Sequence, residues 1–139
     1  ERLAKIQNTE ILFKEGINRN LIVQADREKI RQVLNNLISN AIKYGKENGK
    51  IWIGLYDMEK YVLIEITDNG NGIAEEHLPR LFERFYRIDP SRSRHHGGAG
   101  LGLAIVKHII EAHHQTIHVR STLGKGTTFG FTLQKKKFL

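Results

Sequence analysis

The chain has 139 residues, a length that fits one domain, and it contains no cysteine. This composition excludes a disulfide framework and a thiolate metal site, and no apolar run approaches the roughly 20 residues of a membrane-spanning helix. Lysine and arginine total 22 against 15 acidic residues, and the net charge of +7 fits either a solvated basic surface or an anionic ligand.

The first part of the chain predicts two short strands followed by a long helix. Residues 10–14 and 20–24 are strand candidates, with residues 16–20 as the turn between them. Asp26 then has the character of an N-cap residue. Apolar residues recur after it at helical spacing, so the sequence predicts an amphipathic helix over residues 26–44.

The middle of the chain predicts a hairpin, a short helix and a loop. Residues 50–57 and 61–67 alternate between apolar and polar positions and are joined by a short turn. Residues 75–85 predict a short helix that is broken near Pro79. Residues 87–99 are polar, basic and glycine-rich, which is typical of a loop.

The end of the chain predicts a helix over residues 101–112 and a last hairpin from residues 116–121 and 127–133. Most neighbouring strands in this order are linked by hairpins. We therefore expect one α/β domain over residues 1–139, with a mixed or largely antiparallel sheet and helices on one face. Residues 1–8 are expected to be a linker remnant of a longer protein.

Asn36, Asn40 and Lys43 lie one turn apart on the predicted helix, away from its apolar stripe. Asparagine is a mediocre helix former, so its repetition suggests a specific role. An amide oxygen can coordinate Mg²⁺, and a lysine can contact phosphates. An ordinary solvated helix face remains an alternative, and Tyr44 fits either the core or the lining for a flat base.

The loop Asp68-Asn69-Gly70-Asn71-Gly72 follows an apolar strand. One interpretation is a simple turn. In the other, the Asp68 carboxylate accepts a hydrogen bond from an exocyclic amine such as that of adenine, while Gly70 and Gly72 let the backbone approach a flat ring. A buried acceptor of this kind rejects ligands that lack the donor.

Gly97, Gly98, Gly100 and Gly102 lead into the helix predicted at residue 101. Their spacing does not match a dinucleotide-binding G-x-G-x-x-G motif, and Leu103 stands where a P-loop requires lysine. The glycines still open a helix, whose free N–H groups suit an anion. A tight turn with close packing is the alternative.

These segments together resemble the ATP-binding catalytic domain of sensor histidine kinases, in the GHKL superfamily. The matching motifs are QVLNNLISNAIKY (32–44), DNGNGI (68–73), LFERFYR (81–87), GAGLGLAI (98–105) and GKGTTFGFTL (124–133). The resemblance implies a two-layer α/β sandwich, the Bergerat fold, with a mixed five-stranded sheet on three helices. It also implies that residues 87–99 form a mobile ATP lid.

The resemblance further implies a Mg-ATP site. Asn40 matches the Mg²⁺ ligand, and Asn36, Lys43 and Arg87 match catalytic positions. Asp68 matches the residue that binds the adenine amine. The full set of implied nucleotide-binding residues is Asn36, Asn40, Lys43, Tyr44, Asp68, Gly70, Gly72, Ile73, Phe85, Tyr86, Arg87, Gly98, Gly100, Leu101, Gly102, Leu103 and Thr127.

The sequence departs from the family pattern at two places. Ala99 stands where the glycine-rich motif usually has threonine or serine, which removes one expected lid hydroxyl. His113, His114 and Gln115 stand where the family often has His-Gly-Gly, so the turn after this helix is expected to differ.

The implied reaction transfers the γ-phosphoryl group of ATP to a histidine. None of the seven histidines has the sequence context of the family's phosphoacceptor. The resemblance therefore implies a separate dimerisation/phosphoacceptor domain and a response regulator as partners. It also implies a monomeric isolated domain in the cytoplasm, with no nucleic acid bound, whether or not the parent protein is anchored in a bacterial membrane.

Three alternatives remain open at this point. ATP hydrolases of the same superfamily carry a glutamate general base in the position of Asn36, and an amide cannot act as a base. An anti-sigma-factor kinase would share the nucleotide site but phosphorylate serine. Nucleic-acid binding through the basic lid and tail would predict affinity for polynucleotide that survives saturating Mg-ATP.

Overall fold

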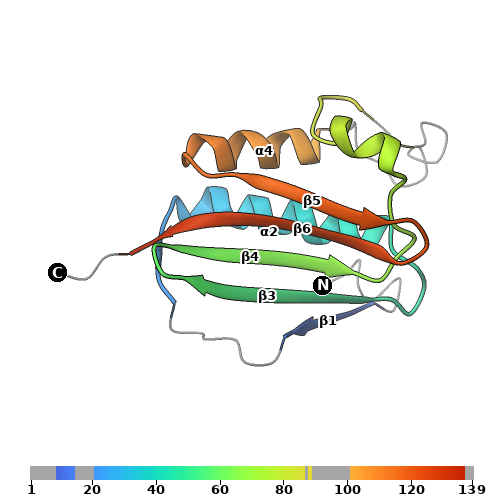
Figure 1. The fold of residues 1–139 in the computed structure, drawn as a ribbon, viewed down its shortest axis with the longest axis horizontal. Helices are drawn as coiled ribbons and strands as arrows, with labels where there is room; N and C mark the ends of the chain where they lie inside the picture. The colour runs from blue at the N-terminus through green and yellow to red at the C-terminus, as the bar shows by residue number, and fades with distance from the viewer. Residues whose placement is uncertain (1–8, 15–20, 87, 89–100, 137–139) are drawn as a thin grey trace.

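The computed structural model describes residues 9–14, 21–86, 88 and 101–136. Figure 1 shows one sheet with helices beside it. The described elements in chain order are β1 (Glu10–Phe13), β2 (Val23–Gln24), α2 (Arg27–Lys43), β3 (Lys50–Met58), β4 (Tyr61–Asp68), the 3₁₀-helix η1 (Glu75–Arg80), α4 (Gly102–Ala112), β5 (Ile117–Thr122) and β6 (Gly126–Lys135).

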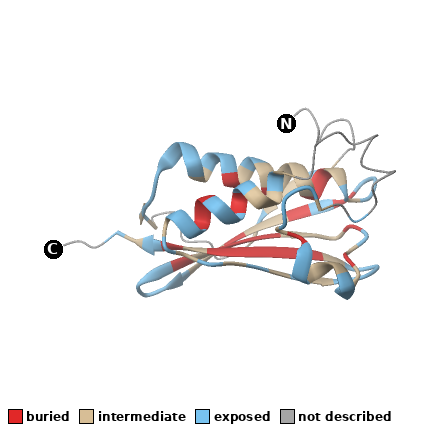
Figure 2. Cartoon of the chain, turned by 90° about the horizontal axis from the view of Figure 1, so that it is seen from above, coloured by how far each residue is buried: buried red, intermediate tan, exposed pale blue. Residues whose placement is uncertain are grey.

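The six strands form one mixed sheet in the order β1-β3-β4-β6-β2, and β5 also pairs with β6. Only β1 and β3 run parallel among these pairs, and the others are antiparallel. The described α-helices, α2 and α4, lie on one face of the sheet (Figures 1 and 2). The predicted two-layer α/β sandwich is therefore confirmed, with one more strand than the five expected, because the two-residue β2 joins the sheet.

The two short N-terminal strands do not pair with each other. β1 pairs with β3 at one side of the sheet, whereas β2 pairs with β6 at the other. The predicted turn over residues 16–20 lies outside the described residues. A local turn signal does not choose a strand's partner: β1 aligns with four residues of β3, and β2 with two residues of β6.

Helix α2 begins and ends within one residue of the sequence prediction. The Asp26 carboxylate accepts a hydrogen bond from the Lys29 backbone N–H at 3.1 Å, which caps the helix. Val33 and Leu37 are 0% exposed and Ala41 is 5% exposed. The apolar stripe thus faces the sheet, and its polar side is left for other contacts.

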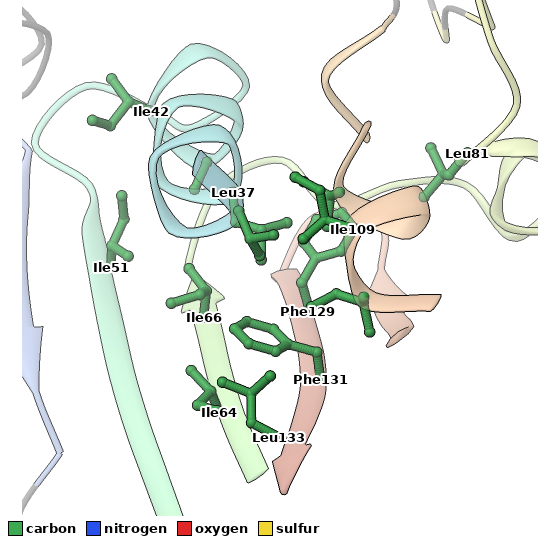
Figure 3. Close-up of a cluster of buried hydrophobic side chains, with 14 of the residues drawn as sticks. Leu37, Ile42, Ile51, Ile64, Ile66, Leu81, Ile109, Phe129, Phe131 and Leu133 are labelled. Carbon is green, nitrogen blue, oxygen red and sulfur yellow. The ribbon is translucent and has the colours of Figure 1, made fainter. Parts of the chain in front are cut away.

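The hydrophobic core lies between the two helices and the sheet (Figure 3). Leu37 of α2 and Ile109 of α4 approach the core from the helix layer, and Ile66, Phe129 and Phe131 project from the strands. Phe131 is 0% exposed. This continuous core holds both helices against one face of the sheet, which makes their relative position well defined.

The short helix predicted over residues 75–85 is a six-residue 3₁₀-helix, Glu75–Arg80, with Pro79 inside it. Proline cannot donate a backbone hydrogen bond, so it suits a short 3₁₀ segment better than a continued α-helix. Among the described helices, none has both the length and the apolar character that a membrane crossing requires.

The turn after α4 is built from His113, His114 and Gln115, the residues that stand where the family often has His-Gly-Gly. His113 accepts a hydrogen bond at Nε2 from the Asp26 backbone N–H at 3.0 Å, and its Nδ1 lies 2.8 Å from the Ile109 carbonyl oxygen. A carbonyl only accepts, so Nδ1 carries the proton. His114 adopts a left-handed φ of 58°, and Gln115 accepts a hydrogen bond from the Thr132 hydroxyl.

The left-handed backbone at His114 predicts an unusual order of stability for two substitutions. A non-glycine residue in this region costs about 1 kcal/mol or more, so His114→Gly should be about 1 kcal/mol more stable than His114→Ala. Urea denaturation of both variants measures the difference.

Lys107, exposed in the middle of α4, provides the matched control. There the alanine variant should exceed the glycine variant in stability by about 1 kcal/mol, following helix propensity. An alanine variant at position 114 at least as stable as its glycine counterpart would contradict the assigned backbone conformation.

Candidate functional site

The polar face of α2 lies beside the start of α4. Asn36, Asn40 and Lys43 are all half-buried and one turn apart. The Asn36 amide Nδ2 donates a hydrogen bond to the Gly102 carbonyl oxygen at 3.4 Å. The structure therefore brings this predicted helix face to Leu101 and Gly102, the N-cap and first residue of α4.

The first turn of α4 offers backbone N–H groups that have no partner within the helix. The Leu101 carbonyl already accepts from Ile105 N–H at 2.9 Å, which shows a regular first turn. An added Cβ at Gly102 would meet no heavy atom within 4 Å among the described residues. Gly102 is therefore not required for close packing within this part of the protein, and the packing interpretation of this glycine loses support.

Asp68 is the last residue of β4 and holds the following loop in shape. Its Oδ1 accepts a hydrogen bond from the Gly70 backbone N–H at 2.8 Å. Gly70 is buried, and an added Cβ there would lie 2.8 Å from Gly45 Cα and 3.0 Å from the Tyr44 carbonyl oxygen. Only a glycine lets this loop pack directly on the C-terminal end of α2.

Burial raises the pKa of the Asp68 carboxyl above its ordinary value. The backbone N–H groups of Gly70 and Thr127 partly oppose this rise by stabilising the carboxylate. The group is thus a desolvated acceptor at the end of a strand. A ligand that donates a hydrogen bond to it would recover part of the lost solvation.

The turn between β5 and β6 closes the other side of the loop. Gly72 has a φ of 72°, and an added Cβ would lie 2.2 Å from the Thr122 carbonyl oxygen. The Ile73 backbone N–H donates to the Ser121 hydroxyl at 2.8 Å. In the pairing of β4 with β6, Thr127 stands directly opposite Asp68. Asp68, Gly70, Gly72, Ile73 and Thr127 are therefore brought together.

Two residues of this region were missed by sequence reasoning. Gly126 has a φ of 140°, and a Cβ there would lie 2.0 Å from the Asp68 carbonyl oxygen. Ser121 bonds the backbone of two loops. Its signal was present in the sequence, because Ser121 occupies a helix-facing position of β5, after the apolar Ile117 and Val119.

The aromatic residues after η1 have different neighbours. Phe82 packs edge-on against Phe129, with ring centroids 6.1 Å apart. The Tyr86 hydroxyl hydrogen-bonds His77 Nδ1, and the Arg80 guanidinium lies 4.7 Å from the centre of the Tyr86 ring. Phe85 is 64% exposed. The described contacts therefore join neither Tyr86 nor Phe85 to the group around Asp68.

Arg87, Ala99, Gly98 and Gly100, with the rest of the predicted lid, lie outside the described residues. Leu103 follows Gly102 in α4 and packs partly buried against the core. The roles predicted for these residues therefore stay predictions.

No group of three or more His, Cys, Asp or Glu side chains that could hold a metal occurs within the described parts of the chain. A divalent cation beside Asn40 would therefore combine its amide oxygen with oxygen atoms of a ligand, which is how Mg²⁺ is commonly shared with phosphates. The donor chemistry of Asn40 fits such an ion.

Helix α2 connects two chemically different ends of the site. Asn36 and Tyr44 are eight residues apart, which is about 12 Å along the helix axis. The Tyr44 end lies beside the desolvated acceptor Asp68, and the Asn36 end presents amides and the N-terminus of α4. Lys43, next to Tyr44, adds an ammonium group on the same polar face. This arrangement suits an elongated ligand with a hydrogen-bond donor on one end and anionic groups on the other.

A comparison with family models matches residues 25–137 to the "Histidine kinase-, DNA gyrase B-, and HSP90-like ATPase" family. Among curated proteins, sensor histidine kinase WalK of Bacillus subtilis is 45% identical over 137 residues, which cover 97% of this chain. Sensor protein SrrB of Staphylococcus aureus is 48% identical over 110 residues, which cover 79% of it. The chain spans only 22% of WalK and 19% of SrrB.

Solved structures give the same result. The catalytic domain of histidine kinase ThkA matches with a TM-score of 0.81 and 34% identity, covering 98% of this chain and 86% of that one. Full-length ShkA in complex with AMPPNP matches with a TM-score of 0.84 and 29% identity, covering 99% of this chain and 28% of that one. ThkA has also been solved in complex with response regulator protein TrrA.

The family match covers more than half of the chain and includes the α2 face, the Asp68 loop and the start of α4. The predicted membership of the GHKL superfamily is confirmed, and so is the predicted similarity to histidine-kinase catalytic domains. The chain belongs to the histidine kinase-, DNA gyrase B- and HSP90-like ATPase family, as a domain of the type found in the catalytic part of sensor histidine kinases.

Proposed function

We propose that this chain binds Mg-ATP and supplies its γ-phosphoryl group to a histidine in a separate dimerisation/phosphoacceptor domain, for two-component signal transduction. The observation that carries the proposal is the placement of the desolvated Asp68 carboxylate at one end of α2, with the polar face of the same helix leading to the N-terminus of α4. The family membership supports nucleotide use.

The adenine end of the site is built around Asp68. Its carboxylate would accept a hydrogen bond from the exocyclic amine, and a 6-oxo purine would lack that donor. The backbone of Gly70 and Gly72 and the side chain of Ile73 would border the ring, with Tyr44 beside it. A buried acceptor discriminates strongly between ligands that can and cannot satisfy it.

The phosphate end is built around α2 and α4. Lys43 would place a positive charge near the phosphates, and the first backbone N–H groups of α4, from Leu101 to Leu103, would face them. Mg²⁺ held by Asn40 would neutralise phosphate charge. Phosphoryl transfer needs mainly such positioning and charge stabilisation. The proposal also gives Arg87, Gly98 and Gly100 phosphate contacts, and Phe85 and Tyr86 a place beside the nucleotide.

The polar contact of Asn36 favours phosphoryl transfer over hydrolysis. An amide cannot remove a proton from water, and in this structure the Asn36 amide nitrogen is directed to the Gly102 carbonyl oxygen. Asn36 would therefore position the start of α4 beside the phosphates. A hydrolase would need another base, and none of the described contacts places one there.

The proposed partners are the dimerisation/phosphoacceptor domain of the parent protein and a response regulator. The match to ThkA, which was solved together with response regulator protein TrrA, supports the second partner. We propose a cytoplasmic, monomeric domain that binds no nucleic acid.

The proposed reaction is tested by incubating the chain with Mg-ATP and a separately produced phosphoacceptor domain of its parent protein. We expect acid-labile, base-stable phosphate on that domain and none on the chain itself. The control omits the phosphoacceptor domain. Steady release of inorganic phosphate in that control, with no phosphorylated domain in the complete mixture, would show a hydrolase instead.

Asp68→Asn should weaken ATP binding by about 1–3 kcal/mol, because it mismatches a buried acceptor with the adenine amine. Isothermal titration calorimetry measures the loss. Asp57→Asn is the matched control, since Asp57 is exposed and pairs with Lys135, and its ATP affinity should be unchanged. Equal affinity of both variants for ATP would remove Asp68 from the site.

The same Asp68→Asn variant should not be less stable without ligand at neutral pH. Because burial raises the folded-state pKa of Asp68, the folded chain holds this proton more tightly than the unfolded chain. The contribution of the Asp68 carboxyl to folding stability is therefore present below its ordinary, unfolded-state pKa and is lost as the pH rises through its raised, folded-state pKa. The amide oxygen that replaces the carboxylate in this variant can still accept the Gly70 N–H, so a substantial loss of stability in the variant at neutral pH would show that the negative charge itself stabilises the fold, contrary to this expectation.

Asn40→Ala should abolish most of the tightening of ATP binding by Mg²⁺, because it removes the amide oxygen available to the ion. ATP titrations at increasing Mg²⁺ concentration measure this effect. Asn35→Ala changes an exposed residue of the same helix and should preserve the Mg²⁺ effect. If both variants respond to Mg²⁺ like the unchanged chain, Asn40 is not the ligand.

A further inference from the structure

Three polar side chains lie in one row across three adjacent strands. Ser121 of β5 stands opposite Thr127 of β6, and Thr127 stands opposite Asp68 of β4. Side chains directly opposite one another project from the same face of a sheet. Asp68 and Thr127 each lie two residues along their strand from the core pair Ile66 and Phe129. Residues two apart on a strand project from the same face, so this row lies on the helix-covered face of the sheet.

The Ser121 hydroxyl has three close polar neighbours, each at 2.8 Å. They are the Ile73 backbone N–H, the Gly126 carbonyl oxygen and the Thr127 hydroxyl. The first can only donate and the second can only accept. A serine hydroxyl has one proton and two acceptor sites, so its proton goes to the Gly126 carbonyl.

The remaining acceptor sites of Ser121 then take the Ile73 N–H and the Thr127 O–H. This assignment uses the full hydrogen-bonding capacity of Ser121. It also fixes the direction of the Thr127 hydroxyl, which must donate its only proton to Ser121. Any further hydrogen bond to the Thr127 oxygen must therefore come from a donor.

Thr127 and Asp68 consequently present two acceptors side by side. Thr127 is only 6% exposed, so an unmatched polar group against it would be costly. An exocyclic amine carries two hydrogens and can satisfy both acceptors. An oxo group in the same place would face two oxygen atoms that have no proton to offer.

We propose that Ser121 is a positioning residue that holds the Thr127 hydroxyl as an acceptor, and that it thereby makes the site select 6-amino over 6-oxo purine nucleotides. The inference rests on the proposed function, because it takes ATP as the ligand. Ser121 acts through Thr127 and does not itself touch the ligand.

A purely structural role for Ser121 predicts a different outcome. Its hydroxyl ties the loop at Ile73 to the turn at Gly126, and losing those bonds would loosen the site for every nucleotide alike. The ratio of affinities for ATP and inosine triphosphate separates the two roles, because the two nucleotides differ only in the 6-substituent and in the proton on N1, and they share their ribose and phosphates.

The test compares Ser121→Ala with Ser121→Thr by competition binding of ATP and inosine triphosphate, in the presence of Mg²⁺. In Ser121→Ala the Thr127 hydroxyl is free to rotate and donate to an oxo group. We expect the preference for ATP to fall by about fivefold in Ser121→Ala. Ser121→Thr keeps a hydroxyl on a strand that tolerates a branched side chain and should retain the preference.

Thr127→Val provides a second arm that does not depend on the folding of the Ser121 variant. It keeps the side-chain shape, removes the acceptor and should also lower the preference for ATP. Combined with Ser121→Ala, it should produce no further change, because Ser121 acts only through Thr127.

Equal losses of affinity for ATP and inosine triphosphate in Ser121→Ala, or in Thr127→Val alone, would overturn the inference. Additive effects of the two substitutions on the ATP preference of the double variant would overturn it as well. If the unchanged chain binds no ATP, the proposed function fails and this inference with it. Clear ATP binding with an unaltered ATP preference in the variants would overturn the inference alone.

Discussion

The direct packing of the Gly70 backbone on the C-terminal end of α2 is the constraint on which the site depends. A Cβ at Gly70 would lie 2.8 Å from Gly45 Cα, so no other residue allows this approach. The contact fixes the Asp68 loop relative to α2, and the apolar stripe of α2 is fixed on the sheet by the core. Loop, helix and sheet therefore hold the acceptor end of the site in one geometry.

The opposite end of the site depends on the same helix. The Asn36 amide reaches the Gly102 carbonyl at the start of α4, and His113 connects the other end of α4 to Asp26, the N-cap of α2. The two helices are thus joined near both ends of α4. A ligand bound along α2 would meet an acceptor pair at one end and amides with helix N–H groups at the other, and in the proposed function this arrangement would orient the nucleotide for phosphoryl transfer.

The sequence predicted the elements well where periodicity and capping agree. Asp26 and the apolar spacing located α2 within one residue, and the alternation in β3 and β4 gave their hairpin. The partners of β1 and β2 could not be deduced from the sequence, because a few residues of local pattern do not encode a distant partner. Ser121 was overlooked, although its helix-facing position could be deduced from the alternation of β5, because its partner Ile73 is 48 residues away and is brought near only by the tertiary fold.

The most direct measurement of the central claim compares adenosine with ATP in binding titrations of two variants. If α2 joins separate base and phosphate ends, Asp68→Asn should weaken the binding of both adenosine and ATP. Asn40→Ala should weaken the binding of ATP and leave the binding of adenosine unchanged. Loss of adenosine affinity in Asn40→Ala equal to its loss of ATP affinity would contradict the division of the site along the helix.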